Sequence, residues 1–348
     1  MNDFVIAERL LLKQFSDLHF DEIEFLSAVN NKNNYEYIYK IFKTKKILPF
    51  AALIFYKLGL DKLKWKKVYS SYAKRNSIIK NFLQTLFLKA EKRGIKSMIL
   101  TENFAVLIST NLPLGCFCSS DVDLFISYED LDKSLLLFKD FGLIQKSQNK
   151  NQGRSSTQFL QFCKSDLIDE DFWINISWKP VTRKYLVQTN YENRLLNLIL
   201  KKKFITKSSI NILDCEHLLY FNALHISSGH FYTQDPGIRL YVDIDRIIRK
   251  NKINWNKILQ IQDIDNAGVR ASLVFVICNK VLGTPIPKSI ISKIRNSLIH
   301  NILLNKLVQS DNSLNKKTNI FCKLLIEIFS NSNLKFLKFN NLMQLFRS

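Results

Sequence analysis

Two aspartates separated by one residue begin an apolar run in the segment FCSSDVDLFIS, residues 117–127. On a β-strand, residues i and i+2 project from the same face, so Asp121 and Asp123 would present two carboxylates side by side. Such like charges repel each other unless a cation lies between them, and hard carboxylate oxygens suit Mg²⁺ or Mn²⁺. The spacing therefore predicts a divalent-metal site held by Asp121 and Asp123.

The same three-residue pattern occurs twice more, at 243–245 and 263–265. Both copies lie in helical patterns, where residues i and i+2 do not face each other. Asp243 instead follows Arg239 at the i, i+4 spacing, which predicts an ion pair on a helix surface. An isolated Asp-x-Asp also fits an acidic turn beside a sheet, so the surrounding helices and strands are needed to choose between a metal site and such a turn.

Predicted strands and helices that would position the aspartate pair alternate between residues 95 and 180. Short apolar runs predict four strands, at 95–100, 121–127, 157–163 and 172–178. Helical periodicity fits 102–110 and 129–140 between them. This order predicts an α+β fold with a small mixed β-sheet.

Helical patterns flank the sheet region on both sides. We expect an N-terminal helical region at 1–94, in which an amphipathic helix at 66–93 stops at Gly94. The sheet domain then covers 95–204, and a C-terminal helical region covers 205–348. The helices predicted in that last region run from a cap at Asp214 to about 228, then over 238–250, 254–264, 267–282 and 287–307.

The net charge and the composition limit the kinds of partner and the cellular location that we expect. The net charge is +21, and lysine clusters occur at 43–46, 62–67 and 201–203. These clusters could bind a polyanion through phosphate contacts, or they could be solvated helix faces in a lysine-rich chain. The six cysteines lack zinc-site spacing, and the longest apolar stretch, 47–56, is too short for a membrane span. We therefore expect a cytoplasmic protein with reduced thiols.

Six short motifs in order resemble a known family over roughly residues 95–287. They are DVDLFIS (121–127), INISW (174–178), HLLYFNALH (217–225), RLYVDID (239–245), NWNKIL (254–259) and LGTPIP (282–287). Together they resemble the bacterial uncharacterised nucleotidyltransferase family of the polymerase-β-like superfamily.

The resemblance implies a nucleotidyltransferase-like domain at 95–204 that binds an NTP and uses Mg²⁺ or Mn²⁺ held by Asp121 and Asp123. Asn103, Ser119 and Ser120 are candidates for phosphate contacts in such a site, although capping of a helix or strand is an alternative role for all three. Three departures from the family pattern stand out. Thr101-Glu102 replaces a Lys-Gly pair, the serine turn lacks an arginine before the aspartates, and Asn175 occupies the position of a third catalytic acid.

The resemblance implies transfer of a nucleoside monophosphate from the NTP to an acceptor, which could be a small molecule, RNA or a protein. Because Asn175 is neutral and Glu102 is acidic, a second hypothesis remains open. In it the chain is a catalytically degenerate relative that uses its positive charge to bind nucleic acid or an acidic partner. A third hypothesis is a toxin- or antitoxin-like role.

Overall fold

The structure of this protein is a computed structural model that describes residues 39–40, 42–43, 46–57, 59, 61–119, 121–145, 159–163, 172–177, 204–229, 238–264 and 268–294. Ser120, the lysines at 201–203, most of the predicted region 1–94 before Lys46 and the tail after Ile294 lie outside these residues. The chain divides into two compact units. The sheet unit comprises Lys46–Thr182 and Glu192–Leu218, and the helical unit comprises Met1–Lys45, Arg183–Tyr191 and Leu219–Ser348.

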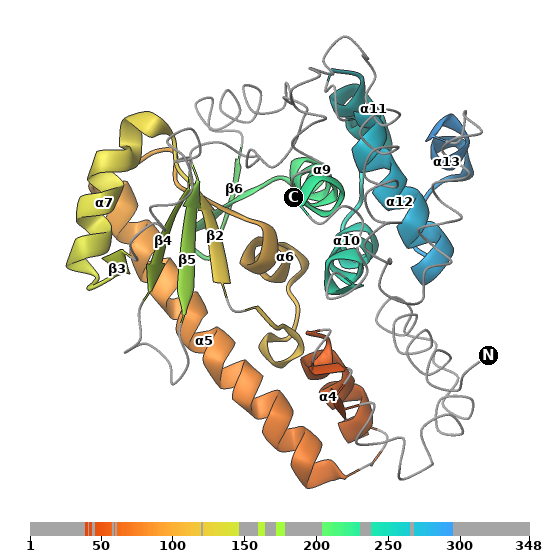
Figure 1. The fold of residues 1–348 in the computed structure, drawn as a ribbon, viewed down its shortest axis with the longest axis horizontal. Helices are drawn as coiled ribbons and strands as arrows, with labels where there is room; N and C mark the ends of the chain where they lie inside the picture. The colour runs from red at the N-terminus through yellow and green to blue at the C-terminus, as the bar shows by residue number, and fades with distance from the viewer. Residues whose placement is uncertain are drawn as a thin grey trace, which may run out of the picture. The chain divides into compact units, whose positions relative to one another are not determined.

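The sheet unit is built on a mixed sheet of seven strands in the order β3-β4-β5-β2-β1-β7-β6 (Figure 1). The strands are β1 Ile99–Thr101, β2 Asp121–Phe125, β3 Ile144–Gln145, β4 Phe159–Cys163, β5 Trp173–Ser177, β6 Phe204–Lys207 and β7 Ile210–Leu213. The central strand β2 pairs antiparallel with β1 and parallel with β5. The α+β class and the mixed sheet predicted from the sequence are confirmed.

The strand β2 forms where the sequence alternates between two environments. Val122 and Leu124 are fully buried on one face, whereas Asp121 and Asp123 are half-buried on the other. This alternation follows from the two-residue period of a strand. The face that carries the carboxylates is therefore fixed by burial of the opposite face.

A long helix, α5 (Lys62–Lys92), runs diagonally beside the sheet in Figure 1. It begins four residues earlier than the predicted 66–93, because Asp61 accepts a hydrogen bond from the backbone N–H of Lys64 and caps the first turn. Trp65 is completely buried and stacks on Phe55 of α4 (Leu48–Lys57), with the ring centroids 4.5 Å apart. The helix ends before Gly94, which has a positive φ of 70° as a residue after a helix end commonly does.

Shorter helices connect the strands. The helix α6 (Glu102–Thr110) matches the predicted range and contacts β1 and β2. A 3₁₀ turn, η1 (Leu114–Cys116), precedes β2, and η2 (Tyr128–Asp130) leads into α7 (Leu131–Asp140).

The sequence prediction fails at residues 204–213, where a continuous helical pattern was expected from about 205. The structure has the hairpin of β6 and β7 there, with Ser208 and Ser209 both at positive φ in its turn. Ile210 and Ile212 are buried as β7 extends the sheet beside β1. Apolar residues at every second position are the strand signal in INIL, but the run is too short to distinguish from helix by periodicity alone.

The helical unit contains α10 (Ile238–Lys250), α11 (Trp255–Ile264), α12 (Gly268–Leu282) and α13 (Lys288–Ile294). Before them, α9 (Cys215–Leu224) begins where Asp214 accepts a hydrogen bond from the backbone N–H of His217, which confirms the predicted cap. It is followed by a π-helical turn, η3 (His225–Gly229). In the described ranges, no helix is both long and apolar enough to span a membrane.

The ion pair of Arg239 and Asp243 is buried, which corrects the prediction of a helix-surface pair. The two charged groups lie 3.8 Å apart on α10, and both side chains are almost completely inaccessible. Burial raises the pKa of the Asp243 carboxyl, although the nearby Arg239 and Arg246 guanidinium groups lower it in part. The sequence pattern of α10 did not indicate this burial, because charged side chains on a helix are usually exposed to solvent.

We expect Asp243→Asn to flatten the dependence of stability on pH. The folded protein binds a proton at Asp243 more tightly than the unfolded chain does, so this group's contribution is present below the unfolded pKa of about 3.8 and is lost as the pH rises through the folded pKa. Urea unfolding of the full chain between pH 4 and pH 8 measures the free energy. Asp263→Asn, at an exposed position on α11, is the matched control and should keep the wild-type slope.

Candidate active site

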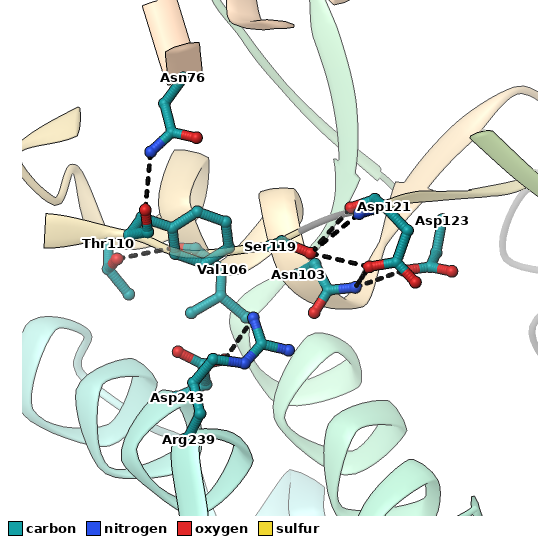
Figure 2. A network of polar contacts seen from close by, with 10 residues as sticks. Asn76, Asn103, Val106, Thr110, Ser119, Asp121, Asp123, Arg239 and Asp243 are labelled. Atoms are coloured by element: carbon teal, nitrogen blue, oxygen red, sulfur yellow. Dashed lines mark hydrogen bonds and ion pairs between the residues drawn. The ribbon is translucent and has the colours of Figure 1, made fainter. Parts of the chain in front are cut away.

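Two amide side chains lie directly against the aspartate pair. Asn103 of α6 donates from Nδ2 to Asp121 Oδ1 at 3.2 Å and to Asp123 Oδ2 at 2.6 Å (Figure 2). Asn175 of β5 donates from Nδ2 to Asp121 Oδ2 at 3.2 Å and to Asp123 Oδ1 at 2.9 Å. Each of the four carboxylate oxygens thus accepts one amide hydrogen. The two asparagines hold together two like charges that would otherwise repel each other.

The strand register explains why these side chains meet. Thr101 of β1 lies opposite Asp123, and Asp123 in turn lies beside Asn175 on β5. Asn175 lies opposite Gln161 of β4. A row of four polar residues therefore crosses the middle of the sheet, with Asn175 and Asp123 at its centre.

Gln161 is a site residue that the sequence analysis missed. Its Nε2 donates to Asn175 Oδ1 at 3.2 Å, which directs the Asn175 Nδ2 group toward the carboxylates. The signal in the sequence was a single polar residue in the apolar strand FLQFC. That signal was too weak to single out one glutamine, because half-buried strands often carry polar residues on one face.

The turn before β2 is tied to the first carboxylate and to α5. The hydroxyl of Ser119 lies 2.8 Å from Asp121 Oδ1 and 2.9 Å from the Asp121 carbonyl oxygen, and the side chain is buried. Arg75 of α5 donates to the carbonyl oxygen of Ser119. The observed contacts of Ser119 therefore position Asp121, whereas phosphate contacts by Ser119, Ser120 or Asn103 stay predictions.

Asn76, next to Arg75 on α5, holds the same turn from a completely buried position. Its Nδ2 donates to the carbonyl oxygens of Leu114 at 2.7 Å and Phe117 at 2.8 Å. The side chain therefore replaces water for two backbone acceptors on the segment that leads to Asp121.

We expect Asn76→Ala to lower the free energy of unfolding by about 2–4 kcal/mol, since it leaves both buried carbonyl oxygens without this donor. Urea denaturation of the full chain measures the loss. Asn81→Ala, at an exposed position on the same helix, should change the free energy by no more than about 0.5 kcal/mol. Because alanine favours helix more than asparagine does, helix propensity cannot explain a loss, and equal losses in the two variants would show that the hydrogen bonds to the turn are not its cause.

The backbone at Glu102 keeps a glycine-like conformation. Glu102 has a φ of 51°, in the left-handed region that favours glycine, and it joins β1 to α6. This is the position where the sequence comparison had placed a family glycine. The backbone here would thus suit the glycine that the resemblance implies, and in this chain the position places a carboxylate at the N-terminus of the helix that carries Asn103.

A hollow of about 180 Å³ in the sheet unit lies at the other end of α6. Its lining includes Lys80, Asn111 and Lys207, but neither carboxylate of the aspartate pair. The candidate active site is therefore a half-exposed polar face of the sheet and is separate from this hollow.

The donor set fits a hard divalent cation. Asp121, Asp123, Asn103 and Asn175 carry oxygen ligands, which Mg²⁺ and Mn²⁺ prefer. A flip of an asparagine side-chain amide group exchanges the positions of Nδ2 and Oδ1. The same amides can therefore donate hydrogen bonds to the carboxylates when no cation is bound, or offer an oxygen ligand to a cation. Among the described residues, no three His, Cys, Asp or Glu side chains form a metal-binding group. A cation here would therefore rely on the amides for its remaining protein ligands.

The fold and the site are those of an α+β domain with paired aspartates on a central strand, which is consistent with a nucleotidyltransferase-type domain. The chain belongs to the uncharacterised nucleotidyltransferase family, whose model matches residues 31–283. This confirms the family predicted from the six motifs. The comparisons with curated proteins and with solved structures each returned no match.

Proposed function

We propose that this protein transfers a nucleoside monophosphate from an NTP to a hydroxyl acceptor, with Mg²⁺ or Mn²⁺ held by Asp121 and Asp123. The observation that supports this function most directly is the convergence of the two half-buried carboxylates with the buried amides of Asn103 and Asn175 on one face of the sheet. The family membership supports the reaction class.

In the proposed reaction the acceptor hydroxyl oxygen attacks the α-phosphorus of the NTP. A new phosphorus–oxygen bond forms, the bond from the α-phosphorus to the bridging oxygen breaks, and pyrophosphate leaves with that electron pair. When bound, the divalent cation supplies charge stabilisation for the phosphate oxygens and lowers the pKa of the acceptor hydroxyl.

The residues of this chain would act mainly by positioning. Asn175 has no basic group and both carboxylates hold the cation, so the acceptor proton passes to solvent. Gln161 orients the Asn175 amide, and Ser119 orients Asp121. Asn103 occupies the first turn of α6, where backbone N–H groups and the helix dipole favour a phosphate.

A second candidate function is binding of a polyanion without catalysis. Two observations favour it: the third acid position holds Asn175, and Glu102 adds a negative charge at the start of α6. In this case nucleotide transfer would be absent while polyanion binding would not depend on Asp121 or Asp123.

The test is a transfer assay with α-³²P-labelled NTPs, Mg²⁺ or Mn²⁺ and a mixture of RNA, protein and small hydroxyl acceptors. We expect the wild-type chain to yield a labelled acceptor and pyrophosphate, and the Asp121→Asn/Asp123→Asn variant to yield neither. A Gln84→Ala variant, altered on α5 away from the carboxylates, is the control for handling and folding.

Labelling that is equal in the wild type and the double aspartate variant would disprove the proposed metal site. If neither protein yields a label while both bind polyanions equally, the non-catalytic function is correct.

A further inference from the structure

The outward face of the first half of α5 carries lysines and no acidic residue of the helix itself. Its exposed positions are Lys62, Leu63, Lys66, Lys67, Ser70, Ser71 and Lys74, which we call the lysine face. No acidic residue occurs anywhere between Lys62 and Ala90. All of its charged side chains are thus positive over the thirteen residues from Lys62 to Lys74, or about 18 Å of helix.

This arrangement is unfavourable for an isolated helix. Lys62 and Lys66 are like charges at the i, i+4 spacing, which destabilises a helix. Lys62 and Lys64 also lie in the first turn, at the positive end of the helix dipole, where Asp61 is the one acidic residue of the cap and first turn. A solvated helix face normally mixes both signs of charge, so this one favours an anionic ligand as its partner.

The chemistry of the lysine face favours the sugar–phosphate backbone of a nucleic acid. Lysine ammonium groups act as point charges for phosphates, and the serine hydroxyls can donate to phosphate oxygens. Aromatic and guanidinium groups that read bases are absent from the exposed positions named above. The opposite side of the helix is buried, with Trp65 against Phe55, so α5 has no apolar face with which to enter a membrane.

The lysine face ends next to the residues that hold the active site. Arg75 and Asn76 follow Lys74 directly, and they bind the carbonyl oxygens of Ser119, Leu114 and Phe117 in the turn before Asp121. Along the helix axis, the lysine face therefore ends level with the segment that positions the first carboxylate, which the buried Asn76 contacts from the opposite side of α5.

We propose that the lysine face binds the phosphate backbone of a nucleic acid and that this nucleic acid carries the acceptor hydroxyl. The binding surface is independent of the proposed function, whereas the acceptor role depends on it. RNA and DNA share the recognised chemistry, and the experiment separates them.

The test uses the full chain with fluorescein-labelled 20-base-pair RNA and DNA duplexes of the same sequence, and anisotropy over a range of salt concentrations. The variant is Lys62→Gln/Lys66→Gln/Lys67→Gln/Lys74→Gln. We expect binding at 100 mM salt to weaken at least about tenfold, and the slope of log K against log salt to fall by about three to four, one phosphate contact per lysine. The duplex type bound more tightly identifies the nucleic acid.

The matched control removes the same charge from exposed lysines elsewhere in the sheet unit, as Lys92→Gln/Lys96→Gln/Lys133→Gln/Lys139→Gln. We expect it to weaken binding by less than about threefold, because distant surface charges are screened. Equal weakening by the two variants would overturn the proposal, as would equally tight binding of polyglutamate or of phosphatidylserine vesicles by the wild type. Absence of duplex binding would also overturn it.

The Asp121→Asn/Asp123→Asn variant separates the two proposals. We expect it to bind the duplexes as the wild type does. Lysine-dependent binding without any transfer would overturn the nucleotidyltransferase proposal and leave the binding surface standing. Transfer to another acceptor without duplex binding would overturn the binding surface and leave the nucleotidyltransferase proposal standing.

Discussion

Asn175→Asp is expected to increase the rate of nucleotide transfer about a hundredfold at saturating Mg²⁺. The substitution places a carboxylate beside Asp123 on the neighbouring strand, in the position that Asn175 now holds. A carboxylate there can accept the acceptor's proton, and a positioned base typically contributes about 10²–10⁴ in rate. Single-turnover transfer of the α-³²P label measures the change.

The same substitution should make the metal-free protein less stable. Three clustered carboxylates repel one another, and the new side chain cannot donate the two hydrogen bonds that Asn175 gives to Asp121 and Asp123. We expect a loss of about 1–3 kcal/mol in the free energy of unfolding without divalent ions, which Mg²⁺ reverses.

Asn103→Asp is the charge-matched control, because it adds one carboxylate against the same pair but from α6. It should also strengthen binding of the cation, but without a comparable gain in rate. If Asn175→Asp and Asn103→Asp change the rate equally, the β5 position has no special role as a base, and the predicted correspondence with the family's third acid is wrong.

Glu102→Gly is expected to tighten NTP binding by about ten- to a thousandfold. A carboxylate about 4 Å from a phosphate charge costs about 1 kcal/mol in water and about 4 kcal/mol at the dielectric constant of a protein surface. Glycine also fits the positive φ of 51° at this position, which costs other residues about 1 kcal/mol or more. Titration calorimetry with a non-hydrolysable NTP analogue and Mg²⁺ measures the affinity.

Glu102→Gln separates the two effects, because it removes the charge and keeps the strained backbone. We expect it to reproduce most of the gain in NTP affinity without the gain in stability that glycine brings. Unchanged affinity in both variants would mean that the Glu102 carboxylate points away from the triphosphate, and the proposed place of the nucleotide at the start of α6 would then be wrong.

The sequence was sufficient to predict the centre of the site. The two-residue spacing placed Asp121 and Asp123 on one face because the alternate residues, Val122 and Leu124, are strongly apolar. The order of motifs located Asn175 on a later strand, and the structure shows that this strand pairs parallel with β2 and places Asn175 in register with Asp123. Periodicity and ordered motifs were informative here because burial constrains every second residue.

The other features of the site and the fold could not be predicted, because they depend on contacts between segments that are distant in the sequence. Gln161 reaches the site only because β4 pairs antiparallel with β5, and neither partner can be chosen from a single strand's pattern. The positive φ of Glu102 is imposed by the junction of β1 and α6 and is not a preference of glutamate. For the same reason the burial of Arg239 and Asp243 was not predictable from their spacing.

The pairing of β7 with β1 has a consequence for work with shortened chains. The strand β7 (Ile210–Leu213) returns after a long connection and lies parallel to β1, with Leu100 beside Ile212. A fragment that ends near residue 203 would leave the backbone donors and acceptors of β1 open to solvent as a new edge strand. Such an edge can recruit strands from other molecules, so that fragment should self-associate, whereas one extended past Leu213 keeps β1 covered.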